Sequence, residues 1–321
     1  MEEYLNTAYD DAFRTMIEKC DDLVFPMLNY MFGEHYSGDE KIIRASNEEL
    51  TQLYGSDVKK RITDSQLIIM SNGERKHYHV ECESSTKTGS VLVRIFEYGA
   101  QIALDDAEIN EDEMKITARF PHAGILFLKC SKKIPDKMTI EIITPNGDGC
   151  KYYVPVMRES EFSLNQIFEK QLYLLLPFYL FHYEKSLSEI NDNEEMLKTL
   201  LDEYDSIAIR LNDLVEEGKL SSTSRYVIIQ MTKRVSDKLA MNHDKVKQRV
   251  GDLMGGHVIE LDIFKAEEKA EARGESKGIS KGADLLANLI KKLTPGSPDY
   301  NDALNGTDDK RQELFKKYNL I

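Results

Sequence analysis

Two short stretches of this chain decide its fold and its candidate chemistry: Arg61-Ile62-Thr63-Asp64-Ser65 and His79-Val80-Glu81-Cys82-Glu83. Sixteen residues separate Asp64 from Glu81, and the polar run Ser71-Asn72-Gly73-Glu74-Arg75-Lys76 lies between them. An Asn-Gly pair between apolar and β-branched runs is typical of a β-hairpin turn. The segment is therefore expected to bring one carboxylate opposite two more.

Strand geometry groups these side chains further. Residues two apart on a strand share a face, so His79, Glu81 and Glu83 are expected to point the same way. Asp64 is expected inside an apolar strand, where a carboxylate needs a cation or hydrogen-bond donors because an unpaired buried charge is costly. Hard divalent cations such as Mg²⁺ take oxygen ligands of this kind. The hairpin is therefore a candidate metal site.

The same acids also have a structural interpretation. They could form a carboxylate cluster on an exposed sheet edge, each group paired with a basic side chain from Arg61, Lys76 or Arg94. His79 could bind phosphate or act as an acid, or it could simply pack. Spacing alone leaves these alternatives open.

Composition limits the class of protein. The chain has 321 residues, 41% of them hydrophobic, so one large domain or two ordinary ones can bury a core. The formal net charge of -14 argues against a nucleic-acid coat protein, whose surface would be basic. An enzyme that grips DNA through a local basic patch stays possible.

Cysteine usage and the chain start indicate a reducing compartment. The four cysteines show no Cys-x-x-Cys spacing, so no zinc site is expected: Cys20, Cys82, Cys130 and Cys150. The start Met1-Glu2-Glu3-Tyr4 lacks the basic and apolar regions of a signal peptide. The apolar run 172–181 is shorter than the roughly 20 residues of a membrane span. We expect a cytoplasmic protein with free thiols and no membrane partner.

The expected order of elements is helix, strands, helix, strands and then helices, which is typical of an α/β fold with a mixed sheet. The helix over 10–32 is expected to kink or split at Pro26 and to stop at Gly33. The other elements expected from periodicity are a strand at 41–45, a hairpin over 60–70 and 76–84, a helix over 91–105, strands at 123–129, 138–144 and 151–157, and an apolar core helix over 162–183.

Charge separates the helical part that follows. Residues 184–217 carry eleven acidic and three basic side chains, whereas 221–250 carry seven basic and two acidic ones. Two antiparallel helices of opposite charge would attract each other. Alternatively, the second helix faces phosphate, with Arg225, Lys233, Arg234 and Lys238 as candidate DNA contacts. The tail beyond 257 is rich in Ala, Glu, Lys and Gly and is a candidate self-association element, so a homo-oligomer is possible.

Five separated blocks of the chain, taken in order, resemble the PD-(D/E)XK nuclease family transposases, also called the Rpn recombination-promoting nucleases. The resemblance spans about residues 9–256, and the blocks are Tyr9–Arg14, Arg61–Asp64, Tyr78–Ser84, Arg94–Leu104 and Ile134–Met138. It implies a restriction-endonuclease-like core with a central mixed β-sheet and an α-helical C-terminal region. The implied division is a nuclease-like domain over 1–183, a helical extension over 184–256 and a tail over 257–321.

The resemblance also implies roles for particular residues. Asp64 and Glu81 match the metal-binding acids, and Asp10 matches a further acid of the N-terminal motif. Arg94 and Tyr98 match the start of the following helix, where positions i and i+4 share a face. Glu83 departs from the family, which has Gln or Lys there. An ionised Glu cannot orient water as a Lys would, but it can add a metal ligand, or accept a proton if the neighbouring acids Asp64 and Glu81 raise its pKa.

The function expected from this resemblance is Mg²⁺- or Mn²⁺-dependent DNA endonuclease activity in recombination or transposition, with Asp64, Glu81 and Glu83 catalytic. His79 joins Asp10, Arg94 and Tyr98 as an auxiliary residue, and DNA is the expected partner. The alternative is a catalytically weakened descendant that binds DNA or protein, which Glu83 and the net charge favour.

Overall fold

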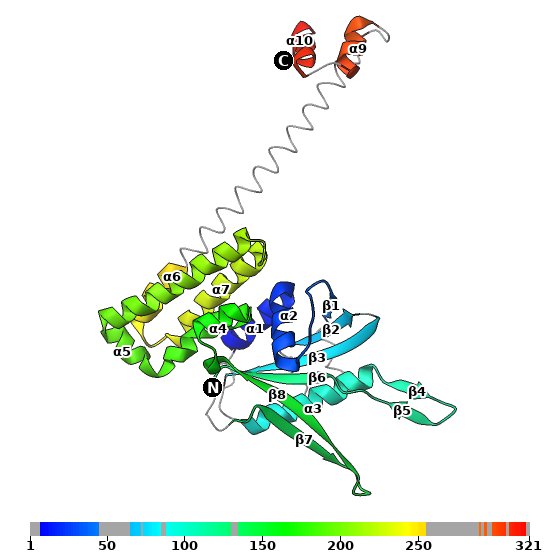
Figure 1. The fold of residues 1–321 in the computed structure, drawn as a ribbon, viewed down its shortest axis with the longest axis vertical. Coiled ribbons are helices and arrows are strands. Elements are labelled where there is room, and N and C mark those ends of the chain that lie inside the picture. The colour runs from blue at the N-terminus through cyan, green and yellow to red at the C-terminus, as the bar shows by residue number, and fades with distance from the viewer. Residues whose placement is uncertain are drawn as a thin grey trace, which may run out of the picture. The chain divides into compact units, whose positions relative to one another are not determined.

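The computed structural model describes residues 7–44, 65–71, 73–84, 88–129 and 134–254, together with 289, 292–293, 297–305 and 308–318. The chain divides into two compact units, Met1–Val258 and Ile259–Ile321 (Figure 1). The three-part division at 183 and 256 stays a prediction.

The first unit is a mixed α/β structure around a six-stranded sheet. Strands β3, β6 and β8 run parallel, and the pairs β1–β2, β2–β3 and β7–β8 are antiparallel. The predicted mixed α/β sheet is therefore confirmed. In sheet order the strands are β1 (Lys41–Arg44), β2 (Gln66–Ser71), β3 (Glu74–Glu83), β6 (His122–Phe127), β8 (Gly149–Arg158) and β7 (Lys137–Ile143).

A second, two-stranded sheet was not predicted. It pairs β4 (Glu108–Asn110) with β5 (Lys115–Thr117), and its hairpin projects from the body of the first unit, as the β7–β8 hairpin does (Figure 1). Both strands have only three residues and carry charged side chains, so no apolar alternation marks them.

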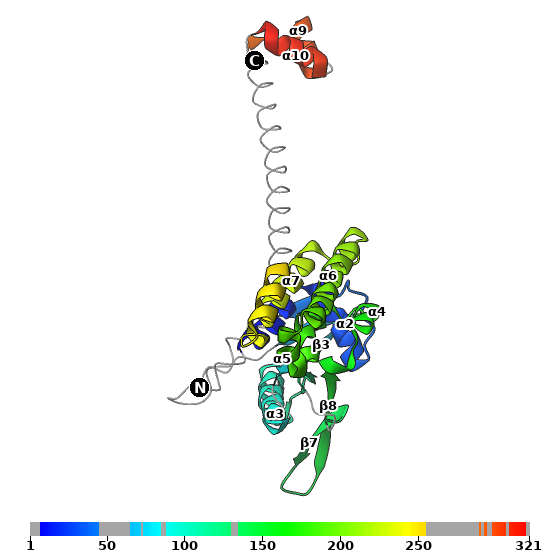
Figure 2. The ribbon, with the colours of Figure 1, turned by 90° about the vertical axis from the view of Figure 1, so that its left-hand side faces the viewer.

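Helices cover both faces of the sheet. Helix α3 (Thr88–Asp105) packs on one face, where its Val91 and Ile95 join a core with alternate residues of β6. Helix α2 (Asp21–Phe32) packs on the other face, and Figure 2 shows the two helices on opposite sides of the strands. A Cβ at Gly124 would come within 2.2 Å of the Met31 sulfur, so α2 approaches β6 closely. The central strand β3 is therefore buried between two layers.

The first predicted helix is split, but at Cys20 and not at Pro26. Helix α1 (Thr7–Lys19) ends there, and Cys20 adopts φ −130° before α2 begins. Pro26 lies inside α2, where proline lacks the N–H of an intrahelical bond. Gly33 ends α2 in the left-handed conformation at φ 69°, as predicted, and its N–H donates to the Asn29 carbonyl.

The apolar run predicted as one helix over 162–183 is built differently. It contains the short helix α4 (Leu164–Glu169) and then a 3₁₀ segment, η3 (Tyr173–Ser186), whose residues 173–181 are all buried. Pro177 lies inside η3, and a proline ring clashes with the carbonyl four residues before it in an α-helix. The run is core, as expected, but its helical geometry was predicted wrongly.

The helices that follow keep the predicted order of charge. The acidic helix α6 (Glu194–Glu216) and the basic helix α7 (Ser222–Leu239) are joined through Gly218, and α7 packs mainly on η3 and α1. A helical stretch over 244–254 follows, and its Lys245 and Arg249 pair with Glu194 at 3.3 and 3.4 Å. The predicted attraction between the acidic and the basic stretch is therefore seen in these two ion pairs.

The second unit has a small core of its own. Leu289, Leu293 and Ala303 are buried with Leu314 and Phe315, around α9 (Pro298–Asn305) and α10 (Asp308–Lys317). Lys317 and Tyr318 both bond the Asp299 carboxylate at 2.6 Å.

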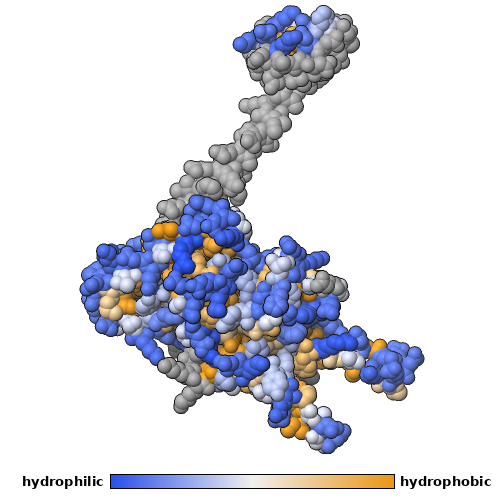
Figure 3. Space-filling model, in the orientation of Figure 1, coloured by the Kyte–Doolittle hydropathy of each residue, from blue (hydrophilic) through white to orange (hydrophobic). Residues whose placement is uncertain are grey.

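Hydrophilic side chains cover most of the face of the first unit in Figure 3. Within the described part of the chain, no helix is both long and apolar enough to cross a membrane. Cys20 and Cys82 are buried and Cys150 is exposed, and none of the three forms a disulfide among the described residues, while Cys130 lies outside them.

Candidate functional site

A buried cluster of acids lies at the end of β3, on the face that α3 covers. Glu81 and Glu83 are only 2% and 5% exposed. They alternate with core residues on a central strand, as the strand pattern predicts. The cluster therefore lies between sheet and helix.

His79 completes this face of β3. Its Nε2 lies 2.8 Å from Oε1 of Glu81, and the ring stands edge-on to Tyr98 of α3 at 5.5 Å. Because a carboxylate accepts, Nε2 donates, which leaves Nδ1 buried without a hydrogen-bond partner. The structure thus brings His79, Glu81 and Tyr98 together, and His79 fixes one oxygen of Glu81.

Arg94 bridges the two glutamates from α3. Its Nε donates to Glu81 over 3.0 Å, and its second nitrogen donates to Glu83 over 2.9 Å. Burial opposes ionisation of Glu81, but His79 and Arg94 outweigh it and hold the pKa of Glu81 below its usual value. Arg94 and Tyr98, four residues apart on α3, therefore share the face that meets β3.

Asp10, in the first turn of α1, adds a third carboxylate. Burial raises the pKa of Asp10 to about 7, and the negative charges of Glu83 and Glu81 add to this, against the opposing charges of Arg14 and Arg94. Asp10 of α1 therefore interacts electrostatically with Glu81 and Glu83 of β3, about 70 residues further along the chain. The cluster carries more negative charge than Arg94 alone neutralises.

The exposed-edge interpretation is wrong for Glu81 and Glu83, which are buried on a strand inside the sheet. The strand β3 lies inside the sheet, and Lys76 pairs with Glu34 at 2.9 Å on the face away from the cluster. Tyr78 donates to the same Glu34 over 2.8 Å. Only the pairing with Arg94 occurs as that interpretation expects, and Arg61 lies outside the described residues.

The cluster suits a hard divalent cation by its chemistry. Carboxylate oxygens are the ligands that such ions prefer, and Asp10, Glu81 and Glu83 supply them from α1 and β3. Among the described residues, however, no three His, Cys, Asp or Glu side chains are arranged to hold a metal ion. The Arg94 guanidinium takes the place of a cation between Glu81 and Glu83. Asp64, the other predicted metal ligand, lies outside the described residues, directly before Ser65 in sequence.

Ser65 itself marks where β2 meets β3. Its hydroxyl donates to the Val80 carbonyl over 3.0 Å and accepts from the Val80 N–H over 3.2 Å. Ser65 is buried, so the chain entering β2 is anchored beside the residue that precedes Glu81.

The predicted DNA contacts on α7 are already engaged in part with acids of this chain. Lys233 pairs with Asp237 one turn on at 2.6 Å, and Arg234 pairs with Asp11 of α1 at 2.7 Å. Arg225 and Lys238 are half-buried on the same helix. None of the four belongs to the acid cluster.

Two further features escaped the sequence patterns. Glu159 is fully buried, with His182 Nε2 2.9 Å from its carboxylate, and burial raises the pKa of Glu159. A groove beside α2 is lined by several separated segments, including the ends of α1, α4 and α6. Residues so distant in sequence share no local motif that could have revealed either feature.

Comparison with known proteins adds no relative. No family model matches the chain, and neither curated proteins nor solved structures give a match.

Proposed function

We propose that this chain is a divalent-metal-dependent DNA endonuclease with a restriction-endonuclease-like core, of the PD-(D/E)XK type that acts in recombination or transposition. One observation carries the proposal: Glu81 and Glu83 lie buried on one face of β3 with His79 and Arg94, and half-buried Asp10 of α1 interacts electrostatically with both glutamates. Such a gathering is costly unless it serves a cation.

The bound Mg²⁺ or Mn²⁺ would polarise the scissile phosphate and lower the pKa of the attacking water. Glu81, with Asp64, would hold the ion, and His79 would keep Oε1 of Glu81 oriented. Asp10, with a pKa of about 7, is suited to accept a proton near neutral pH. Glu83 supplies an additional oxygen ligand where the resembling family has Lys or Gln.

In this scheme Arg94 would bind different partners before and after an ion is bound. Without the ion it neutralises Glu81 and Glu83. Once an ion takes over those carboxylates, its guanidinium is free to contact the phosphate backbone, whose oxygens it can bind in a fork. The α7 side chains Arg225, Lys233, Arg234 and Lys238 are further candidates for such contacts, which read little sequence.

Plasmid nicking tests the proposal. The full-length chain should nick supercoiled DNA in Mg²⁺ or Mn²⁺ and not in EDTA, and Asp64→Ala and Glu81→Ala should each abolish nicking. Nicking that survives both changes would refute the assigned site. Binding by the chain should weaken as salt rises.

A second function is favoured by Arg94 itself. An arginine that bridges both β3 glutamates stabilises the cluster without any metal. The chain would then be a nuclease-fold protein that binds DNA or protein without turnover. DNA binding with no cleavage in any divalent metal would support this alternative.

A further inference from the structure

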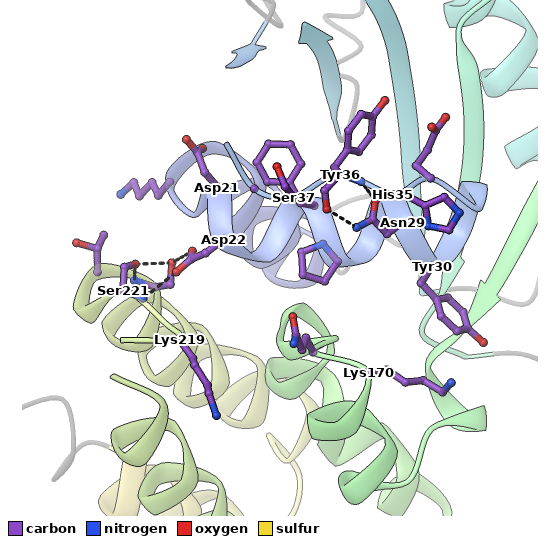
Figure 4. A pocket seen from close by; sticks show the side chains of 18 residues that line it. Asp21, Asp22, Asn29, Tyr30, His35, Tyr36, Ser37, Lys170, Lys219 and Ser221 are labelled. Atoms are coloured by element: carbon purple, nitrogen blue, oxygen red, sulfur yellow. Dashed lines mark hydrogen bonds between the residues drawn. The ribbon is translucent and has the colours of Figure 1, made fainter. Parts of the chain in front are cut away.

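A groove of about 900 Å³ runs beside α2 and shares no residue with the acid cluster. In Figure 4, α2 forms one wall, and the segments that carry Lys170 and Lys219 lie across from it. The volume is within the range of about 300–1,000 Å³ typical of ligand sites. The groove is large enough for a ligand and is not part of the proposed reaction centre.

Two of the three acids that line the groove, Asp21 and Glu34, have basic partners, and Asp22 accepts hydrogen bonds from neutral donors. Arg44 pairs with Asp21. Asp22 accepts from the Ser221 N–H over 2.8 Å at the start of α7. Glu34 is held by Lys76 and Tyr78, as described above. Arg44 and Lys76 therefore offset two of these three negative charges, and Asp22 keeps its own.

Three lysines line the same groove from three separate elements: Lys19, Lys170 and Lys219. All three are exposed, and among the described residues no acid lies within ion-pair distance of Lys19 or Lys170. Lys219 pairs with Glu217 at 2.7 Å, but both side chains are more than half exposed, so that pair is weak. The groove therefore favours an anionic ligand.

Tyr30 provides a flat apolar surface beside these charges. Its side chain is 46% exposed, although Phe162 holds the ring edge-on at 5.2 Å. The Lys170 ammonium lies 5.5 Å from the ring centroid (Figure 4). An exposed aromatic ring next to basic side chains is the arrangement on which nucleic-acid bases stack.

Gln171 lines the groove in a conformation that glycine would adopt more easily. Its φ is +58°, one residue beyond the Lys170 C-cap of α4, and the Leu172 N–H donates to the Ile167 carbonyl over 2.8 Å. This is a helix end that usually has glycine at the left-handed position. Glutamine in its place puts an amide donor and acceptor at the groove.

We propose that this groove binds a single-stranded nucleic-acid segment, with the lysines at its phosphates and Tyr30 against a base. The inference rests on the proposed function, since it assumes that the chain acts on DNA. Helix α1 joins the two places: Asp10 lies in the cluster and Lys19 in the groove, about 14 Å apart along the helix. The groove would hold part of the nucleic-acid strand that lies outside the reaction centre.

The test is fluorescence anisotropy of a labelled single strand of about 12 nucleotides, with the full-length chain in EDTA so that no cleavage occurs. The variant Lys19→Gln/Lys170→Gln/Lys219→Gln is compared with Lys137→Gln/Lys151→Gln/Lys198→Gln, which removes the same charge from exposed lysines elsewhere. The groove variant should bind about tenfold more weakly, and its salt slope should be less negative by about 2. The control should bind like the unmodified chain.

Tyr30→Ala should weaken binding by about fivefold or more without changing the salt slope. A free mononucleotide should compete poorly, because it reaches fewer lysines than a strand. Equal affinities for the two triple variants, or a Tyr30→Ala variant that binds as before, would overturn the proposal that the groove binds nucleic acid. If the unmodified chain nicks DNA but the groove variant binds the strand as well as before, only the proposed role of the groove is refuted. Groove-dependent binding without nicking refutes the proposed function alone.

Discussion

The Nε atom of Arg94 lies 3.0 Å from a carboxylate oxygen of Glu81, and the same guanidinium also holds Glu83. Arg94→Ala would leave two buried carboxylates facing each other without a cation. We expect the free energy of unfolding in EDTA to fall by about 1–3 kcal/mol, less than for a fully buried pair because Arg94 is 32% exposed.

Urea unfolding in EDTA and in Mn²⁺ measures this effect. Mn²⁺ should stabilise Arg94→Ala more than it stabilises the unmodified chain, since the ion replaces the lost charge. The matched control is Arg119→Ala, because Arg119 pairs with Glu108 at the surface, where both side chains are about two-thirds exposed. If the two variants lost equal stability, the bridging role of Arg94 would be wrong.

Asp10 gives a pH dependence of defined sign. The pKa of the Asp10 carboxyl is about 7 in the folded chain, against an ordinary value of 3.8 in an unfolded chain. The folded state therefore holds the proton more tightly. Stability is therefore lost as pH rises from about 4 to 7. Asp10→Asn in EDTA should leave stability unchanged near pH 4 and raise it by about 1–2 kcal/mol above pH 7, after allowance for solvent screening.

Thermal or urea unfolding across this pH range provides the measurement. Asp11→Asn is the control, because Asp11 pairs with Arg234 at the surface and should show no gain at high pH. An Asp10→Asn variant that is less stable than the unmodified chain at pH 8 would contradict the repulsion between Asp10 and the β3 glutamates.

Close packing of α2 on the sheet predicts opposite effects for two glycines. Gly124→Ala should destabilise the fold by about 1–3 kcal/mol, because its new methyl group would lie 2.2 Å from the Met31 sulfur and 3.0 Å from Phe32. Gly89→Ala in α3 meets no atom within 4 Å and should be neutral or stabilising by up to about 1 kcal/mol. Equal urea midpoints for both variants would refute the close approach.

Sequence patterns were informative wherever one local period decided the structure. The Asn-Gly turn between apolar and β-branched runs predicted β2 and β3 as a hairpin, and the period of two put His79, Glu81 and Glu83 on one face. Helical spacing put Arg94 and Tyr98 on the face of α3 that meets them. Which side chains share a face follows from the geometry of a single strand or helix, so these relationships could be predicted from the sequence.

The rest depends on tertiary packing. Nothing local indicates that Arg94 bridges both glutamates, that α1 brings Asp10 to them, or that the groove gathers lysines from three elements. Pro26 predicts a helix break by its chemistry, yet it is accommodated inside α2 and the chain turns at Cys20, where no local pattern marks a break. The short strands β4 and β5 are too polar to carry a period.

The central claim is that the cluster around Glu81 performs metal-dependent DNA hydrolysis, and the most direct test is single-turnover plasmid cleavage by Glu81→Gln beside Glu159→Gln. Both changes remove the charge of a buried glutamate while keeping its shape, but Glu159 pairs with His182 and lies outside the cluster. We predict that Glu81→Gln lowers the Mg²⁺-dependent cleavage rate at least about 100-fold and that Glu159→Gln leaves it nearly unchanged. Equal cleavage rates for the two folded variants would contradict the account.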